Sequence, residues 1–444
     1  MLISPRKQVR NHVHHSIGTC LHKNVADKAD FYDKITITGN NKMSYNFLFI
    51  NNHFSILGGN DCGASVRSTV LIEALAHIGQ VDIINFCDKK ISKDSENCNI
   101  IYENYISDEN PATHQHNLST RIQKYIKPFN PQSHFTINRE KESIIDAVIH
   151  SRADKNPYDY VVCRYISEAV TCGLLKYADR LIVDVDDNPF SETLRTLAHI
   201  NPWQPWKYIT GLYRAISVNA MTNKILDKIC ISFHSNKIDS PHKSSIYLNN
   251  VPGVCHETTT FTCIENHKIL IVGWIDYAPN KYGITRFVKR IFPEIRKVVP
   301  DTTLNIAGKT KDETFFDWLN SNEGVNALGF VEDLQNEYNA AQVVIIPLYH
   351  GSGTSVKFTE AMSMGKPVVS TKAGVRGFDD ICKENIHYLC AKTDKDFAQK
   401  IIYLLTSPAK CEALSINANN VAKDNLSKDH FFNTVEKAIC RRNI

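Results

Sequence analysis

The chain has 444 residues, of which 43% are hydrophobic and 22% are charged, as in ordinary globular proteins with two or three domains. Its 51 lysines and arginines nearly balance 47 aspartates and glutamates, so bulk charge gives no reason to expect a nucleic acid partner. No apolar run approaches the roughly 18 residues of a membrane-spanning helix, which leaves only peripheral contact with a membrane.

The thirteen cysteines are many for such a chain, but they form no CxxC pair and no spacing typical of metal ligands. Their number is odd, and no signal peptide is recognisable at the start of the sequence. This pattern is typical of reduced thiols, so we expect a cytoplasmic protein, or one that contacts a membrane peripherally.

Residues 1–43 are polar, basic and rich in histidine, which is typical of a solvated extension outside the folded domains. The histidines His12, His14 and His15 leave a metal-binding cluster open as the alternative. Their spacing matches no standard metal site, so we favour the extension.

Residues 44–255 alternate strands with helices. Strands are predicted over 46–50, 81–86, 160–164, 180–184, 229–232 and 245–248, with an amphipathic helix over 66–78. Because no hairpin signal joins the strands, they predict a doubly wound parallel sheet of the α/β class. Periodicity pauses over 251–266, so we place a domain boundary there and a second domain over 265–426.

One predicted helical segment, residues 203–220, interleaves aromatic and basic side chains. The residues concerned are Trp203, Trp206, Lys207, Tyr208, Tyr213 and Arg214. Two interpretations stay open: a helix packed on the first domain, which we favour, and a helix that lies in a membrane interface.

The second domain repeats the alternation, with strands predicted over 269–273, 304–308, 343–348 and 367–370. Between the last two strands lies GSGTSVKFTEAM, residues 351–362, a turn of small and hydroxyl residues that opens a helix. The first amides of a helix have no intrahelical partners, and small residues let an anion approach them. This strand–turn–helix–strand unit predicts a phosphate site.

Two charged residues extend this prediction. Lys357 lies about one turn inside the helix and adds a positive charge, and Glu360 follows three residues later on the same face. A carboxylate beside an anion is unfavourable unless it has another task, and accepting hydrogen bonds from a sugar diol is a natural one. The sequence therefore predicts a site for a nucleoside diphosphate.

This window resembles the donor-binding helix of the retaining glycosyltransferases of family 4. Those enzymes have the GT-B architecture, two Rossmann-like domains that face each other across a cleft. The resemblance continues over 269–280, 300–308 and 328–334, and is close from His267 to Phe378. Family members usually carry two glutamates separated by seven residues; here Glu360 matches the second, and Ser352 stands at the place of the first.

The resemblance implies that Glu360 contacts the donor, through its ribose hydroxyls, and that Lys357 contacts the diphosphate. Lys281 and Lys309 lie near the positions from which the family neutralises the leaving diphosphate. The implied donor-binding set is Gly273, Lys281, Lys309, Phe330, Val331, Leu334, Ser352, Gly353, Thr354, Ser355 and Glu360.

In the first domain, Gly58, Gly59 and Gly63 look like the family's glycine-rich loop, which approaches the diphosphate and the acceptor from across the cleft. Arg67 opens the next predicted helix and Arg164 ends a predicted strand; each is a candidate for contact with phosphate or acceptor, and the alternative is a surface arginine. A terminal helix within 427–444 would cross back onto the first domain, as it does in the family.

Asp184-Val185-Asp186 allows a different hypothesis, a manganese site, because an Asp-x-Asp after a strand binds manganese in the GT-A glycosyltransferases. We favour a site without metal or other cofactor, since the segment continues as a loop common in family 4 and a motif this short is weak.

The sequence thus predicts a retaining glycosyltransferase with a nucleotide diphosphate sugar as donor and a glycan or lipid-linked acceptor, in glycan or surface polysaccharide synthesis. The alternative is a non-catalytic nucleotide-sugar-binding or partner subunit, which Ser352 at the place of a glutamate favours. An epimerase or phosphorylase on the same architecture is a further alternative, although no acid–base pair that faces a sugar is evident.

Overall fold

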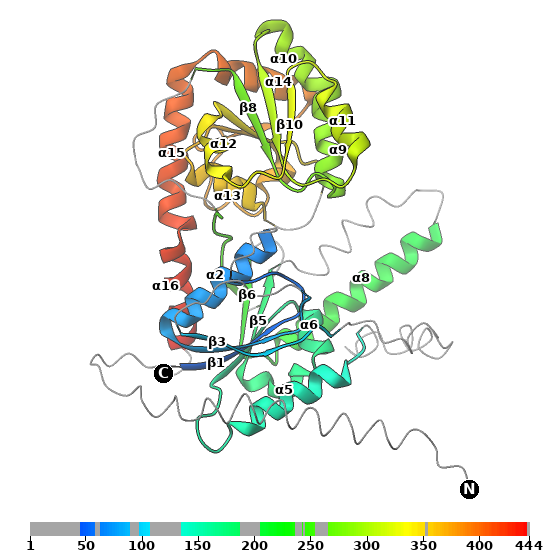
Figure 1. Ribbon diagram of the computed structural model, residues 1–444, viewed down its shortest axis with the longest axis vertical. Coiled ribbons are helices and arrows are strands. Elements are labelled where there is room, and N and C mark those ends of the chain that lie inside the picture. Colours follow the sequence, from blue (N-terminus) through cyan, green and yellow to red (C-terminus); the bar gives the residue numbers. More distant parts are fainter. Residues whose placement is uncertain are drawn as a thin grey trace.

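The computed structural model of the chain describes residues 45–57, 63–88, 97–106, 135–186, 205–235, 242, 245–253, 265–350 and 354–441. Several predictions therefore concern residues outside these ranges. They are the 1–43 extension with its histidines, Gly58, Gly59, Trp203, Ser352 and Gly353. Figure 1 shows two α/β lobes stacked along the long axis of the molecule, with helices α15 and α16 along one side of both.

The N-terminal lobe is built on a parallel sheet of seven strands in the order β3-β2-β1-β4-β5-β6-β7. Its strands are β1 (Tyr45–Asn51), β2 (Gly79–Asn85), β3 (Cys98–Glu103), β4 (Tyr160–Arg164), β5 (Leu181–Asp186), β6 (Ile231–His234) and β7 (Ser245–Tyr247). Its helices are α2 (Gly63–Ile78), α5 (Arg139–Ser151), α6 (Ile166–Thr171), η2 (Leu174–Arg180) and α8 (Pro205–Leu226).

The C-terminal lobe has six parallel strands in the order β10-β9-β8-β11-β12-β13. They are β8 (Lys268–Val272), β9 (Thr303–Ala307), β10 (Val325–Gly329), β11 (Val343–Ile346), β12 (Val368–Thr371) and β13 (Leu389–Ala391). The helices are α9 (Ala278–Arg286), η3 (Phe287–Ile291), α10 (Phe292–Val298), α11 (Glu313–Asn320), α12 (Leu334–Ala340), α13 (Val356–Ser363), η4 (Lys372–Val375), α14 (Asp394–Leu405), α15 (Pro408–Leu426) and α16 (Lys428–Cys440).

Strand β1 shows why the sheets are buried on both faces. Phe47 and Phe49 belong to one hydrophobic cluster, and Leu48 and Ile50 belong to another, all with no exposed surface. Successive side chains of a strand point to opposite faces, so a run of apolar residues requires a covering layer on each side. The predicted fold class, two doubly wound parallel sheets, is confirmed.

The last helix leaves the C-terminal lobe and packs on the N-terminal one. Phe431 and Val435 of α16 lie in the same buried cluster as residues of α2, and Lys428 pairs with Glu73 of α2 at 3.0 Å. Figure 1 shows α15 and α16 running along both lobes. The chain end therefore ties the two lobes together by hydrophobic contact.

Two differences from the predicted elements have simple causes. Helix α2 begins at Gly63, three residues before the predicted start at Val66, because glycine, alanine and serine add no hydrophobic periodicity. Strand β3 was not predicted; it lies at the edge of the sheet and most of its residues are only half-buried, so its sequence lacks the apolar run of a central strand.

Candidate nucleotide-sugar site

The C-terminal sheet brings together the ends of β8 and β11, which are neighbours although the chain leaves them toward opposite sides of the sheet. Ligands of doubly wound proteins bind at such a switch point, outside the carboxyl ends of the strands. Gly273 directly follows β8, and α13 begins ten residues after β11 with Ser355 as its N-cap. The Ser355 hydroxyl is buried and has no hydrogen-bond partner within the described part of the chain.

Lys357 lies in the resulting recess. Its ammonium donates to Asn280 Oδ1 of α9 at 2.7 Å. Gly273, at φ +135°, leaves the space for it, because a Cβ there would lie 3.0 Å from Lys357 Nζ. Burial lowers the pKa of Lys357 to about 8, against the opposing effect of Glu360. The recess is lined by Ile271, Val272, Gly273, Asn280, Ile284, Ile345, Pro347, Leu348 and Lys357.

Glu360 is only 8% exposed. Its Oε2 accepts a hydrogen bond from the Tyr338 hydroxyl at 3.0 Å, and the carboxylate also accepts from the backbone N–H of Gly253. Burial raises the pKa of Glu360 to about 7, although these two hydrogen bonds and Lys357 act in the other direction. Half-buried Lys357 and buried Glu360 are therefore charged groups whose direct hydrogen-bond partners among the described residues are neutral.

The beginnings of α2 and α13 meet where the two lobes approach each other. A Cβ on Gly63, the first residue of α2, would lie 2.7 Å from Val356 Cγ2, so the two backbones come close only because Gly63 has no side chain. Val66 of α2 lies near Gly253, which in turn contacts Glu360. Gly63 thus lies beside the beginning of α13.

Arg67 and Arg164 are corrections to the prediction, because neither side chain reaches a ligand surface in this structure. Arg67 is 1% exposed and binds Asp184 through Nε at 2.8 Å and Nη2 at 2.6 Å. Arg164 is 2% exposed and binds Asp184 at 3.0 Å and Asp186 at 2.6 Å. A buried guanidinium needs such partners, so both arginines are part of the packed interior.

The same network argues against a manganese site at Asp184 and Asp186. Asp184 and Asp186 are neutralised by two guanidinium groups, and a cation at this place would have to displace them. Burial opposes ionisation of Asp184, but the two arginines hold its pKa below the ordinary value. Within the described ranges, no group of three His, Cys, Asp or Glu side chains is arranged to hold a metal ion.

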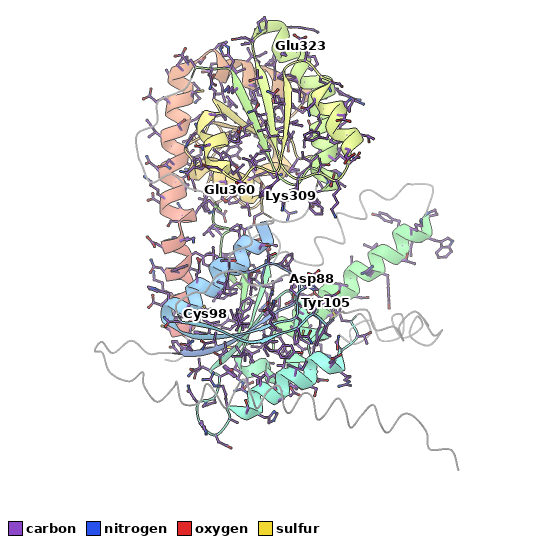
Figure 2. All side chains as sticks on the ribbon, viewed as in Figure 1. Asp88, Cys98, Tyr105, Lys309, Glu323 and Glu360 are labelled. Carbon is purple, nitrogen blue, oxygen red and sulfur yellow. The ribbon has the colours of Figure 1, made fainter. Side chains whose placement is uncertain are left out.

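The other two predicted lysines are Lys281, on α9, and Lys309, which follows β9. They differ from Lys357 because each ammonium lies over an aromatic ring. Lys281 Nζ binds Asp312 at 2.5 Å and lies 4.7 Å from the centre of the Phe315 ring. Lys309 Nζ lies 4.5 Å from the centre of the Phe330 ring, which is 62% exposed. Figure 2 shows Lys309 and Glu360 at the edge of the C-terminal lobe that faces the N-terminal lobe.

The other two apolar residues predicted to border the base are Val331, between β10 and α12, and Leu334, the first residue of α12. Val331 and Leu334 are half-buried against the cluster that contains Val272 and Tyr338. Asp333 caps α12 by accepting a hydrogen bond from the Asn336 N–H at 3.2 Å. These side chains thus border the same switch point as Gly273.

Three residues of this site were missed in the sequence. Asn280 and Tyr338 hold the two buried charges, and Asn250 contacts Thr354 just before α13. The only local indication of a role for Asn250 is its position two residues before the Pro252–Gly253 pair. No local sequence pattern indicated Tyr338, because a single tyrosine in a helical segment is usual in a core.

The N-terminal sheet has its own switch point between β1 and β4, and aromatic residues follow both strands. Phe54 and Tyr165 have ring centres 5.9 Å apart, and His53 Nε2 lies 3.5 Å from the buried carboxylate of Glu168. Tyr165 adopts φ 63°, ψ 143°, a strained conformation for a residue other than glycine. Such strain is most often found at functional sites.

Residues 266–407 match a family model described as Glycosyl transferases group 1. An uncharacterized 44.6 kDa protein in the cps region of Klebsiella pneumoniae is 26% identical over 182 residues. That alignment covers 39% of this chain and 46% of the relative, so the chain spans less than half of the relative's length.

Solved structures share the fold over most of the chain at low sequence identity. Sucrose-phosphate synthase from Thermosynechococcus elongatus matches with a TM-score of 0.61 at 16% identity, covering 89% of this chain and 98% of that one. Anabaena HepE in complex with UDP and glucose matches at 0.55 and 13%, covering 89% and 100%. Staphylococcus aureus TarM, in complex with UDP and sugars, matches at 0.57 and 11%, covering 89% and 99%. The chain therefore has the GT-B fold, and residues 266–407 of its C-terminal lobe are similar to the group 1 glycosyltransferases.

Proposed function

We propose that this chain is a retaining glycosyltransferase that moves a sugar from a nucleoside diphosphate sugar to a hydroxyl group of a glycan or lipid-linked acceptor. The observation that carries the proposal is the pair of half-buried Lys357 and buried Glu360 on the first turns of α13, beside the buried Ser355 hydroxyl. These residues lie within the segment that matches the group 1 glycosyltransferases.

The diphosphate is assigned to the beginning of α13. The first amides of a helix have no intrahelical partners, and the half-buried ammonium of Lys357 strengthens the attraction because its surroundings screen charge less than bulk water does. Among the described residues, the Lys357 ammonium donates only to the neutral amide of Asn280, which a phosphate oxygen can replace without breaking an ion pair. Ser355 adds a hydroxyl that has no partner among the described residues.

Glu360 is assigned to the donor's diol, most simply that of the ribose. An ionised carboxylate has two acceptor oxygens, and here they accept from one hydroxyl and one backbone N–H. A diol offers two hydroxyl donors of the same kind. The pKa of about 7 leaves a large ionised fraction at neutral pH.

In the reaction we propose, the bond between the anomeric carbon and the diphosphate oxygen breaks. The acceptor oxygen bonds to that carbon on the same face, and the acceptor proton passes to the released phosphate. No protein nucleophile is required, so the protein contributes position and electrostatic stabilisation. Lys357 and the first amides of α13 stabilise the charge that develops on the diphosphate.

We place the acceptor at the switch point of the N-terminal sheet. His53, Phe54 and Tyr165 are partly exposed there, and aromatic rings present large rigid surfaces to a ligand. Glu168 lies behind His53 and favours one orientation of the imidazole. A relative in a cps region and solved relatives in complex with UDP and sugars support a glycan acceptor and a uridine nucleotide as the first donor to try.

The first experiment is a thermal-shift screen with UDP, GDP, ADP, dTDP and their common sugars, with and without manganese. We expect stabilisation by one nucleotide, equal in both conditions. Release of that nucleotide from its sugar conjugate, on addition of a glycan acceptor, then separates an enzyme from a binding subunit. Binding without any release would favour the non-catalytic subunit, and no binding at all would contradict the proposal.

Helix α8 favours peripheral contact with a membrane. Its exposed apolar residues are Trp206 (75% exposed), Ile216 (55%), Ile209 (54%), Tyr208 (50%) and Leu212 (40%). Residues 205–210 are all exposed, and Figure 1 shows this part of the helix projecting from the N-terminal lobe. No helix in the described ranges has the length and hydropathy needed to cross a bilayer.

We propose an anionic bilayer surface as the partner of α8, because the helix contains Lys207, Arg214 and Lys224 and no acidic residue. Pairing of two copies through this helix would bring like charges together. Apolar side chains with basic neighbours bind such surfaces by burial and by charge.

Co-sedimentation with vesicles of phosphatidylglycerol and of phosphatidylcholine tests this proposal. We expect binding to the anionic vesicles only, weakened by Tyr208→Ser and by salt. Tyr403→Ser is the matched control, since Tyr403 is also 50% exposed but lies on α14 of the other lobe. Equal loss with both variants, or a concentration-dependent dimer lost with Tyr208→Ser, would overturn it.

A further inference from the structure

We propose that Asn250 is a positioning residue for the nucleotide site: it carries a rigid hydrogen-bonded connection from the interior of the N-terminal lobe to the loop before α13. We call the series Asp184–Arg67–Asn250–Thr354 the Asn250 link. The proposal rests on the function proposed above, because it assigns the link to donor binding. All four residues are 8% exposed or less.

The link begins at a fixed point. Asp184 has no exposed surface and holds Arg67 through two hydrogen bonds, at 2.8 and 2.6 Å. Arg67 Nη1 also donates to the carbonyl of Leu248 at 2.8 Å, and the guanidinium lies 6.0 Å from the centre of the Phe431 ring. The guanidinium is held in one position, because it contacts β5, the segment after β7 and α16.

That position determines how the Asn250 amide faces. Arg67 Nη1 donates to Asn250 Oδ1 at 2.8 Å. A guanidinium has no acceptor, so the amide oxygen must face Arg67 and the amide nitrogen must face the other way. Asn250 Nδ2 then donates to the hydroxyl of Thr354 and to its carbonyl oxygen, the latter at 3.3 Å.

Thr354 is the last residue before the N-cap of α13. It follows residues 351–353 and precedes Ser355, so its backbone is continuous with the amides proposed to bind the diphosphate. Holding both its hydroxyl and its carbonyl restricts the rotation of this segment. Asn250 itself belongs to the segment between β7 and β8, which joins the two lobes.

The link acts through hydrogen-bond geometry and not through charge. The Arg67 charge is neutralised by Asp184 and Asp186 within the interior of the N-terminal lobe. The group that contacts Thr354 is therefore the neutral N–H of the Asn250 amide, in a fixed orientation. Pre-positioning of a binding loop increases affinity because less conformational entropy is lost on binding. We expect the link to increase nucleotide affinity without contacting the nucleotide.

Two substitutions break the link at one bond each. Asn250→Asp keeps an oxygen for Arg67 but removes the N–H group that faces Thr354. Thr354→Val keeps the side-chain shape but removes the hydroxyl, and Thr354→Ser is its matched control because it keeps the hydroxyl. In full-length protein, titration calorimetry with UDP, or with the nucleotide that binds best, gives the dissociation constant of each variant.

We expect Asn250→Asp and Thr354→Val to weaken nucleotide binding by about tenfold, as the loss of one buried hydrogen bond predicts, and Thr354→Ser, which keeps the hydroxyl that Asn250 contacts, to bind more tightly than Thr354→Val. The melting temperature is measured beside each affinity. A purely structural role would lower the melting temperature of both variants and leave nucleotide affinity unchanged, and that result would overturn the proposal.

Hydrogen exchange separates the link from the function on which it rests. The amides at the beginning of α13 should exchange faster in Thr354→Val than in Thr354→Ser, without any ligand. Wild-type protein that binds no nucleoside diphosphate would contradict the proposed function, whatever the exchange shows. Equal exchange in the two variants would contradict the link, even if the wild type binds nucleotide well.

Discussion

Two groups of charged side chains, one in each lobe, have opposite kinds of partner. In the N-terminal lobe, Arg67 and Arg164 are paired with Asp184 and Asp186, and each of these four charges has an opposite charge within 3 Å. In the C-terminal lobe, the direct hydrogen-bond partner of Lys357 is an amide. A buried charge with an ionic partner is satisfied, whereas one with a neutral partner gains from a charged ligand.

The directions of the pKa shifts differ between these two groups of charges in the same way. The pKa of Arg67 is raised: burial alone would lower it, but the effect of Asp184 and Asp186 is greater. Burial lowers the pKa of Lys357 to about 8 and raises that of Glu360 to about 7. The pKa shifts of Arg67 and Asp184 favour their charged forms, whereas the pKa values of Lys357 and Glu360 lie near neutral pH, as is common at functional sites.

The largest expected effect is on stability, from Arg67→Met. The substitution leaves Asp184 without its bidentate partner, and removing one member of a buried ion pair costs about 3–5 kcal/mol. We expect a large fall in the melting temperature. The double variant Arg67→Met with Asp184→Asn should recover part of the loss, and no recovery would show that Arg67 acts through its packing against Phe431.

Lys357→Met should have the largest effect on binding. It keeps most of the side-chain volume but removes the charge, and a hydrogen bond to a charged group is worth about 1.5–3 kcal/mol. We therefore expect nucleotide affinity to fall by about tenfold to a hundredfold, with an unchanged melting temperature. Lys297→Met, at a lysine that is exposed on α10, is the control; an equal loss there would exclude a specific role for Lys357.

Glu360→Gln should reduce donor affinity or turnover by about tenfold while the protein stays folded, because an amide offers one acceptor oxygen in place of two. Calorimetry and a nucleotide-release assay measure the two quantities. Wild-type activity in this variant would remove Glu360 from the site.

The pH dependence of nucleotide affinity sharpens the comparison further. Lys357 must be protonated to hold a phosphate, so affinity should fall as pH rises above about 8. Glu360 must be ionised to accept from a diol, so affinity should fall as pH drops below about 7. Each limb has a slope of at most about tenfold per pH unit. The alkaline limb should vanish in Lys357→Met, and its persistence would assign it to another group.

Tyr338→Phe should have the smallest effect. The Tyr338 hydrogen bond lowers the pKa of Glu360, so its loss should move the acid limb of the affinity profile to higher pH. At neutral pH we expect a loss of affinity of about twofold to fivefold, equivalent to one ordinary hydrogen bond. An acid limb that does not move would show that this limb does not report Glu360.

The sequence by itself determined the architecture. Apolar runs such as 46–50 and 343–348 have the length and burial pattern of central parallel strands, and this pattern needs no information about neighbours. The turn at 351–355 and the charges at Lys357 and Glu360 were also visible locally, because a phosphate-binding helix start is a contiguous segment.

Only the tertiary structure decided which charges are paired. Arg67 and Asp184 are 117 residues apart, and Asn250 and Thr354 are 104 apart, so no local pattern relates them. A helix-start arginine near a glycine-rich loop has the same sequence whether it faces a ligand or an aspartate. The folding of β5 next to β4, and of the segment after β7 against α2, placed the aspartates and the amide beside the arginines. Because of these contacts between distant segments, Arg67 and Arg164, which we predicted to contact a ligand, lie in the packed interior.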